Sequence, residues 1–221
     1  MPEEPLVSVI VPTWARHNML FKRCLPSIAR QTYSGPIEVC LVSDGKDWEL
    51  EDLLAAHAED LDSHGAISNI KYENVPGTLN HFPRWGNEAR RLALDMAEGE
   101  FITYLDDDDA YRPRHCEVLV KSLQEHPDAG FCYSKMASWG AAIDPPGGAI
   151  VGGTTLAPTQ VGTPMIMHRA SLVPHWGPPD AMEDWQMVKR WCEDGVVSYH
   201  VAEVTIDVWP QAYRGFGEDE I

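Results

Sequence analysis

Four consecutive carboxylates, Asp106 to Asp109, directly follow the apolar residues 101–105. Neighbouring carboxylates repel one another, so a run of four at the end of a buried strand favours a bound cation. Their oxygen atoms suit a hard divalent ion, Mn²⁺ or Mg²⁺, with phosphate alongside. In an extended segment alternate side chains share a face, so we expect Asp106 and Asp108 to bind the metal while Asp107 and Asp109 point elsewhere. The alternative interpretation is a solvated acidic turn.

Two further loops follow predicted strands and carry residues that could bind a ligand. Residues 12–16 follow the first strand, and Asp44 with Gly45 follows the second. Ligands of open α/β sheets bind at the carboxyl ends of parallel strands, so we expect these loops and the aspartates to meet. Asp44 could accept hydrogen bonds from a base edge, while Gly45 allows a tight turn. Taken alone, the Asp-Gly pair is only a turn signal.

Arginines gather at the start of a helix predicted over residues 85–97. Arg84 precedes this helix, and Asn87, Arg90 and Arg91 fall in its first turns. Helix amino termini favour anions, and guanidinium groups bind phosphate through paired hydrogen bonds. The segment therefore predicts a diphosphate site, although arginines on helix surfaces are often merely solvated.

A second group of carboxylates, Glu183 and Asp184, begins another predicted helix. A carboxylate within about 3 Å of an attacking hydroxyl can accept its proton as a general base. Acidic residues at helix starts also serve as N-caps or as partners of the helix dipole, which is the alternative here.

The composition restricts the class of protein. A chain of 221 residues suits a single domain, and 34 acidic against 17 basic residues disfavour nucleic acid bound through a broad basic surface. No apolar stretch approaches the roughly 20 residues of a membrane span, and the first five residues lack the basic segment of a signal peptide, so we expect a cytoplasmic protein. The five cysteines are odd in number and widely spaced, which favours reduced thiols.

The predicted elements alternate as in a parallel α/β sheet flanked by helices. A kink or break is expected at Pro26. The predicted strands cover residues 6–11, 36–43, 67–72, 100–105, 130–134 and 165–167, with one or two more over residues 196–209. The predicted helices cover residues 18–33, 48–61, 85–97, 113–126 and 182–194. Residues 138–164 are rich in glycine and proline and are expected to form a loop or an irregular hairpin.

Five motifs, in order, make the chain resemble the family 2 glycosyltransferases. They are residues 8–13, 41–45, 87–90, 99–109 with Pro113, and 183–185. The resemblance implies a single Rossmann-like GT-A domain over residues 1–221 with a mostly parallel sheet. Residues 1–110 would bind the nucleotide and residues 111–221 the acceptor. It also implies an inverting, metal-dependent transfer from a nucleotide sugar, usually a UDP-sugar.

The resemblance also implies roles for particular residues. Asp44 would recognise the base, Asp108 would be the direct Mn²⁺ or Mg²⁺ ligand, and Asp184 would be the catalytic base. Asp106 would contact the ribose or the metal. With the arginines above, the donor-binding set is Pro12, Thr13, Arg16, Asp44, Arg84, Asn87, Arg90, Asp106 and Asp107, and the metal set is Asp106 and Asp108.

The chain departs from the family pattern in ways that leave the acceptor open. It lacks the Gln-x-x-Arg-Trp motif of processive polysaccharide synthases, and neither His168, His175 nor His200 is assigned to the metal. The acceptor could be a saccharide, a small molecule or, against the acidic charge, nucleic acid. The alternatives in other classes are a nucleotidyltransferase, which commonly has a glycine-rich phosphate loop, and a non-catalytic carbohydrate-binding or nucleotide-sugar-binding protein.

Overall fold

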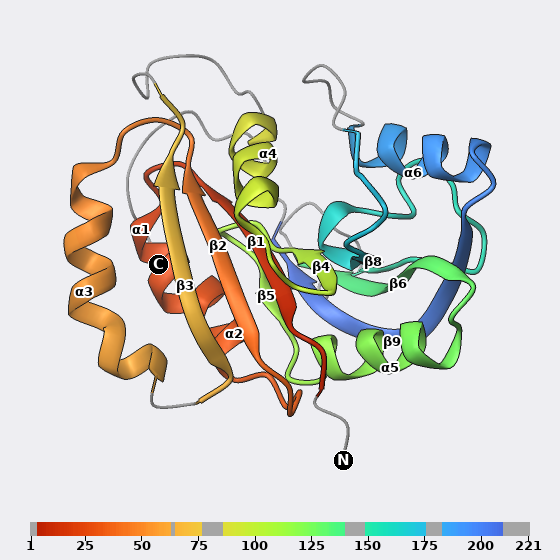
Figure 1. The fold of residues 1–221 in the computed structure, drawn as a ribbon, viewed down its shortest axis with the longest axis horizontal. Coiled ribbons are helices and arrows are strands. Elements are labelled where there is room, and N and C mark those ends of the chain that lie inside the picture. Colours follow the sequence, from red (N-terminus) through yellow and green to blue (C-terminus); the bar gives the residue numbers. More distant parts are fainter. Residues whose placement is uncertain (1–3, 63–64, 77–85, 140–148, 176–182, 210–221) are drawn as a thin grey trace.

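Four parallel strands form the first half of one mixed sheet, in the order β3, β2, β1 and β4 (Figure 1). The computed structural model describes residues 4–62, 65–76, 86–139, 149–175 and 183–209. The strands are β1 (Val7–Thr13), β2 (Ile37–Ser43), β3 (Ile67–Asn74) and β4 (Phe101–Tyr104). Every residue of β1, β2 and β4 is buried, as expected for strands covered on both faces.

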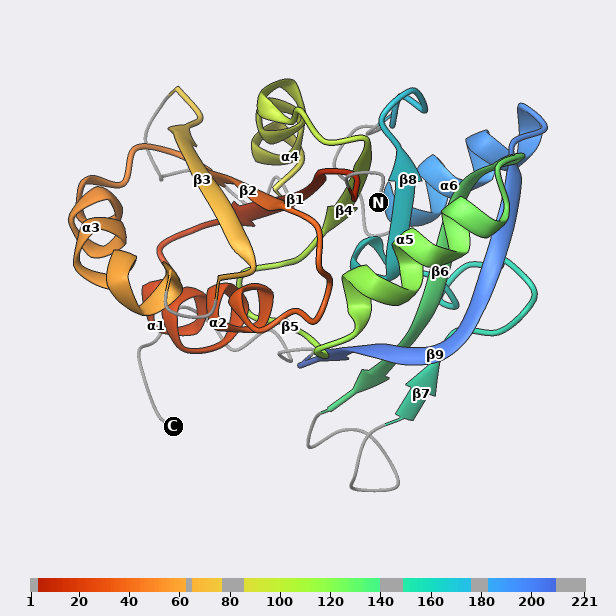
Figure 2. The same cartoon turned by 60° about the horizontal axis from the view of Figure 1, so that its bottom comes forward.

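The second half continues the same sheet with antiparallel pairings and curls it. Strand β8 pairs antiparallel with both β4 and β6, and the long β9 runs parallel to β6 before its end meets β5. Figure 2 shows the strongly curved β9, which descends beside β6 and then bends toward β5. The strands are β5 (Ala110–Tyr111), β6 (Ala129–Ser138), β7 (Ala149–Val151), β8 (Ile166–Arg169) and β9 (Val197–Val208).

Helices cover both faces of this sheet (Figures 1 and 2). One face carries α1 (His17–Met19), a π-helix (Leu20–Cys24), α2 (Leu25–Ala29), α3 (Trp48–Asp62) and α5 (His115–Glu125). The other face carries α4 (Asn87–Met96) and α6 (Glu183–Glu193). The prediction of a GT-A-like α/β architecture, with a largely parallel centre between helices, is therefore confirmed.

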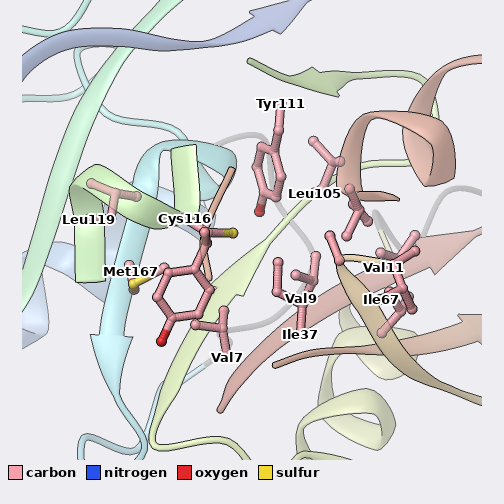
Figure 3. Packing of buried hydrophobic residues seen from close by; sticks show 14 of the residues in the cluster. Val7, Val9, Val11, Ile37, Ile67, Leu105, Tyr111, Cys116, Leu119 and Met167 are labelled. Carbon is pink, nitrogen blue, oxygen red and sulfur yellow. The ribbon is translucent and has the colours of Figure 1, made fainter. Parts of the chain in front are cut away.

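The core divides into two clusters because side chains alternate along each strand. Val7, Val9 and Val11 of β1 pack into the first cluster, shown in Figure 3. Ile10 packs into the second, with the buried alanines of α4 and with Trp191 of α6. Both clusters lie beside β1 and β4, so the strands that precede the candidate site are held from both sides.

One predicted helix ends early, and one of the two alternatives for residues 138–164 is found in part. The helix expected over residues 18–33, with a kink or break at Pro26, is indeed interrupted, because the chain passes from α1 through the π-helix to α2, but it ends at Ala29 instead of residue 33. Pro26 has no amide hydrogen to donate to the preceding turn, which accounts for the irregularity. Within the region expected to be irregular, β7 pairs with the end of β6, so part of it is a hairpin.

Candidate active site

The three loops singled out in the sequence meet at one edge of the sheet. Thr13 and Ser43 are paired at the carboxyl ends of β1 and β2. The amide of Asp44 donates to the carbonyl of Thr13 over 2.9 Å, and the Thr13 hydroxyl donates to Asp107 Oδ2 over 2.8 Å. Gly45 has φ of 115°, a conformation that favours glycine. The predicted convergence of these loops is confirmed.

The aspartates themselves form a turn instead of an extended segment. Strand β4 ends at Tyr104, and the amide of Asp109 donates to the carbonyl of Asp106 over 3.1 Å. The expected alternation of faces is therefore wrong for the middle pair, because Asp107 and Asp108 both contact Arg16. A four-residue turn rotates successive side chains by less than a strand does, so neighbours can share one partner.

Asp107 anchors the turn to the loop after β1. Its buried carboxylate accepts hydrogen bonds from the Thr13 hydroxyl and from the amide of Trp14, the latter over 3.2 Å. Arg16 Nη1 lies 3.1 Å from Asp107 Oδ1 and 2.6 Å from Asp108 Oδ2. The sequence-predicted residues Thr13, Arg16, Asp107 and Asp108 thus form one bonded group.

The start of α4 contacts the aspartate turn at Asp106, from the face of the sheet opposite to α1 and the π-helix. Arg90 is buried, and its Nη2 lies 2.6 Å from Asp106 Oδ1. Asn87 is also buried in the first turn. Gly86, with φ of 72°, caps the helix so close to Pro12 that an added Cβ would lie 3.1 Å from the proline Cβ. Arg84, the remaining predicted diphosphate ligand, lies outside the described residues.

The end of β9 is tied to the aspartate turn as well. The amide of Trp209 donates to Asp109 Oδ1 over 3.1 Å, and the Arg23 guanidinium stacks 3.9 Å from the centre of the Trp209 ring. Arg23 also donates to the carbonyl of Asp108 over 2.6 Å. The second half of the chain therefore contacts the turn directly through Trp209. The contact of Arg23 with the turn was not expected from the sequence.

Burial and mutual repulsion disfavour the ionised form of the carboxylates in the turn. Burial raises the pKa of Asp107 and of Asp108, although Arg16 opposes both shifts. Burial also raises the pKa of Asp109 well above its usual range, with the charges of Asp106 and Asp108 adding to the effect. A cation bound near these carboxylates would stabilise their ionised form.

The donor set suits a divalent cation that is shared with phosphate. Among the described residues, no three His, Cys, Asp or Glu side chains converge as a complete metal site. Mg²⁺, however, is usually bound by one or two carboxylates together with waters and substrate phosphates. Asp106 and Asp108 are hard oxygen ligands of that kind, so the residues present fit such an ion.

Asp184, the predicted base, lies near the start of α6 and is held by one neighbour. Its two carboxylate oxygens accept from the backbone amide of Thr163, over 3.1 Å, and from the Thr163 hydroxyl. Thr163 is buried and begins a short 3₁₀ helix (Thr163–Met165) just before β8. No sequence pattern predicts this contact, because the two residues are distant along the chain.

Other polar residues near the loops were also missed. His17 Nε2 lies 2.7 Å from Asp47 Oδ2, and Asp47 Oδ1 accepts from the first amides of α3 as its N-cap. An Asp before an amphipathic helix is a recognisable capping signal that could have identified Asp47. His168, one of the three histidines not assigned to the metal, is buried, and its Nε2 lies 2.8 Å from the Tyr104 hydroxyl.

Comparison with known proteins identifies the family. The family model for glycosyl transferase family 2 matches residues 8–140, more than half of the chain. A GalNAc(5)-diNAcBac-PP-undecaprenol β-1,3-glucosyltransferase of Campylobacter jejuni is 30% identical over 121 residues, covering 55% of this chain and 35% of that enzyme. The glycosyltransferase GlyG of Streptococcus pneumoniae is 28% identical over 120 residues, covering 54% of this chain and 36% of the relative. This chain therefore spans roughly a third of the length of these two relatives.

Solved structures share the fold at low sequence identity. Residues 1–349 of S. aureus TarS, in complex with UDP-GlcNAc, superpose with a TM-score of 0.67 at 18% identity, covering 96% of this chain and 59% of that one. The mannosyltransferase PcManGT of Pyrobaculum calidifontis, in complex with GDP-Man and Mn²⁺, superposes with a TM-score of 0.65 at 16% identity, covering 96% of this chain and 59% of that one.

None of the helices in the described part of the chain has the length and apolar character that crossing a bilayer requires.

The sheet order, the joined loops and the family match agree with one another. The chain has the GT-A fold and belongs to glycosyl transferase family 2.

Proposed function

We propose that this chain is an inverting, metal-dependent glycosyltransferase that moves a sugar from a UDP-sugar to an acceptor hydroxyl. The observation that carries the proposal is the hydrogen-bonded convergence of the loops after β1, β2 and β4. Ligands of open α/β sheets bind at this edge. The acceptor is a hydroxyl-bearing molecule, a saccharide or a smaller compound, and it would approach over residues 111–221.

The nucleotide would lie across the joined loops. Asp44 would accept hydrogen bonds from the base, and Arg84 with Arg90 would face the diphosphate. The choice of UDP is supported by the TarS structures, which contain UDP and UDP-GlcNAc. The proposed donor residues are Pro12, Thr13, Arg16, Asp44, Arg84, Asn87, Arg90, Asp106 and Asp107.

Asp106 and Asp108 would hold the cation, Mn²⁺ or Mg²⁺. Bound there, a divalent ion would offset the negative charge that develops on the departing diphosphate. The presence of Mn²⁺ with the donor in the PcManGT complex supports this part of the proposal. Arg90 would keep Asp106 oriented, since its guanidinium is buried and lies 2.6 Å from that carboxylate.

Asp184 would act as the general base. Its carboxylate would accept the proton of the acceptor hydroxyl as that oxygen attacks the anomeric carbon from the face opposite the leaving diphosphate. This attack inverts the configuration of the sugar. The two hydrogen bonds from Thr163 would hold Asp184 in one orientation and leave its remaining lone pairs for the acceptor.

Thermal unfolding with UDP and Mn²⁺ tests the donor site. A ligand that binds only the folded state raises the temperature at which half of the protein is unfolded. At a ligand concentration of roughly 100 times Kd, the free energy of unfolding increases by about 2.7 kcal/mol. We expect UDP with Mn²⁺ to stabilise the wild type and Asp184→Asn, and to have little effect on Asp108→Ala. GDP provides the comparison for base selectivity.

Product analysis tests the chemistry. The wild type should release UDP from a UDP-sugar in the presence of an acceptor, and Asp184→Asn should be slower by about 100-fold or more. Release of UMP would instead indicate nucleotidyl transfer. Binding of UDP without turnover on any sugar donor would favour a non-catalytic nucleotide-sugar-binding protein.

A further inference from the structure

Arg16 occupies the position from which a cation would reach the aspartate turn. Its Nη1 lies 2.6 Å from Asp108 Oδ2 and 3.1 Å from Asp107 Oδ1. The Asp107 and Asp108 side chains are only 6% and 15% exposed, whereas the Arg16 side chain is 47% exposed. The guanidinium therefore lies between two largely buried carboxylates and the solvent.

The two other arginines that contact this turn are held more firmly. Arg90 is buried against Asp106, and Arg23 is fixed by the carbonyl of Asp108 and by the ring of Trp209. Arg16 differs because both of its described partners are carboxylates and nearly half of its side chain faces water. It is thus the arginine of these three that can leave the turn by side-chain rotation alone.

The backbone around Arg16 supports such a rotation. Ala15, which directly precedes Arg16, has φ of 50°, an uncommon conformation for a residue with a Cβ. The carbonyl of Arg16 accepts from the amide of Leu20 over 3.0 Å, which ties the following helix to it. The main chain is therefore fixed at this point, and the exposed side chain is the part that can move.

We propose that Arg16 and the divalent cation are alternative partners of Asp108, so that Arg16 must release this carboxylate when the cation binds. A guanidinium at 2.6 Å and a metal ion at about 2.1 Å from one carboxylate would place like charges a few ångströms apart, where they repel strongly. This inference rests on the proposed function, which assigns the cation to Asp106 and Asp108.

The released guanidinium has a new partner in the same site. Its planar donors suit a diphosphate, which would arrive with the cation. When the nucleotide binds with the cation, contacts between Arg16 and the diphosphate replace the lost contacts with Asp107 and Asp108. When the cation binds alone, Arg16 loses those contacts and gains none. The expected result is weak binding of the cation alone and positive coupling between cation and nucleotide.

Calorimetric titration of Mn²⁺ into nucleotide-free protein tests the exchange without any measurement of activity. Removing the competing charge in Arg16→Gln should tighten Mn²⁺ binding by about tenfold. Arg16→Lys, which keeps the charge, should stay within about threefold of the wild type. The matched control is Arg114→Gln, because Arg114 is an exposed arginine that also pairs with two carboxylates, Glu117 and Glu203. Its Mn²⁺ affinity should not change.

A second titration with saturating UDP measures the coupling. UDP should strengthen Mn²⁺ binding less in Arg16→Gln than in the wild type, because the variant has no contact to give up. Far-UV circular dichroism establishes folding of each variant, and Arg16→Met allows the same comparison if Arg16→Gln does not fold.

Unchanged or weaker binding of Mn²⁺ by the neutral variants would overturn the exchange. If the wild type still binds UDP in a Mn²⁺-dependent manner, that result would leave the proposed function standing. If neither the wild type nor any variant binds Mn²⁺ or UDP, the proposed function fails together with the inference.

Discussion

At the scale of single residues, the proposed chemistry depends on how one carboxylate is held. Asp184 accepts a backbone and a side-chain hydrogen bond from the same residue, Thr163, which is itself buried. Because the amide and the hydroxyl reach different oxygens, the carboxylate cannot rotate freely about its last bond. A base that is positioned in this way loses little orientational freedom when the acceptor arrives.

Replacing Thr163 with Val should impair turnover more than donor binding. The variant keeps the backbone amide and the approximate shape but loses the hydroxyl that fixes Asp184. We expect kcat for UDP release from the sugar donor to fall by roughly tenfold while KM for the donor stays nearly constant. Steady-state kinetics over a range of donor concentrations provides the measurement.

Thr163→Ser is the matched control, because serine retains the hydroxyl and loses only a methyl group. Most of the wild-type kcat should return in this variant. An equal loss in the serine and valine variants would indicate a packing role for Thr163. A rise in donor KM without a change in kcat would count against a positioning role.

At the scale of elements, β4 places the aspartates between the two halves of the sheet. It pairs with β1 on one side and β8 on the other, and it carries buried polar contacts on both faces. Thr103 donates to the carbonyl of Ile166 over 2.8 Å, while the Tyr104 hydroxyl lies 2.8 Å from His168 Nε2. A short strand of four residues is thus fixed in register before the turn begins.

The entry to β4 requires glycine at position 99 for steric reasons. A Cβ there would lie 2.6 Å from Ser8 Oγ, 2.7 Å from the Ser8 amide and 2.8 Å from the carbonyl of Leu6. Two of these atoms are backbone, so they have little room to move. We expect Gly99→Ala to lower the free energy of unfolding by about 1–3 kcal/mol, as overpacked sites do, and urea denaturation measures the change.

Gly153→Ala is the control for that substitution. A Cβ at Gly153 would meet nothing within 4 Å. The same chemical change should therefore leave the free energy of unfolding within about 0.5 kcal/mol of the wild type. Similar losses at both positions would mean that the contact with β1 is not the cause.

At the scale of the whole molecule, the sequence predicted the parts that depend on local patterns. Apolar runs that end at Pro12, Asp44 and the aspartates located β1, β2 and β4, and the βαβ rhythm placed their loops at one edge. The arrangement of β5, β8 and β9 could not be predicted, because it depends on pairings between distant segments, antiparallel for β8 and β5 and parallel between β9 and β6. The same limitation applies to the contact between Thr163 and Asp184.

The aspartate turn shows why local periodicity also failed in one place. An alternating pattern assumes an extended backbone, and the chain instead turns after Tyr104. The turn is stabilised by partners that are distant from it along the chain, among them Arg16, Arg90 and Trp209. Only the folded molecule brings these partners together, so the sharing of Arg16 by two aspartates could not be derived from spacing.

The pH dependence of stability sums contributions from the whole molecule. Burial lowers the pKa of His115 to about 3 and that of His168 to about 4, against about 6.5 in an unfolded chain. Below pH ~6.5 the unfolded state therefore binds protons that the folded state does not, and these histidines reduce stability as the pH falls. Burial also raises the pKa of Asp107, although Arg16 opposes the shift, and a raised carboxyl pKa acts in the opposite direction because it favours the folded state as the pH falls.

Substituting one buried histidine separates these opposing contributions. Between pH 5 and 6, His168→Gln should flatten the plot of unfolding free energy against pH by up to about 1.4 kcal/mol per pH unit, the value for one proton. The contribution of Asp107 is common to both proteins and cancels in the difference.

Tyr104→Phe is the control, because it removes the hydroxyl next to His168 but keeps the histidine. The slope of its unfolding free energy against pH should match that of the wild type even if the variant is less stable. Equal slopes for His168→Gln and the wild type would mean that the folded protein protonates His168 as readily as the unfolded chain, which is incompatible with its complete burial.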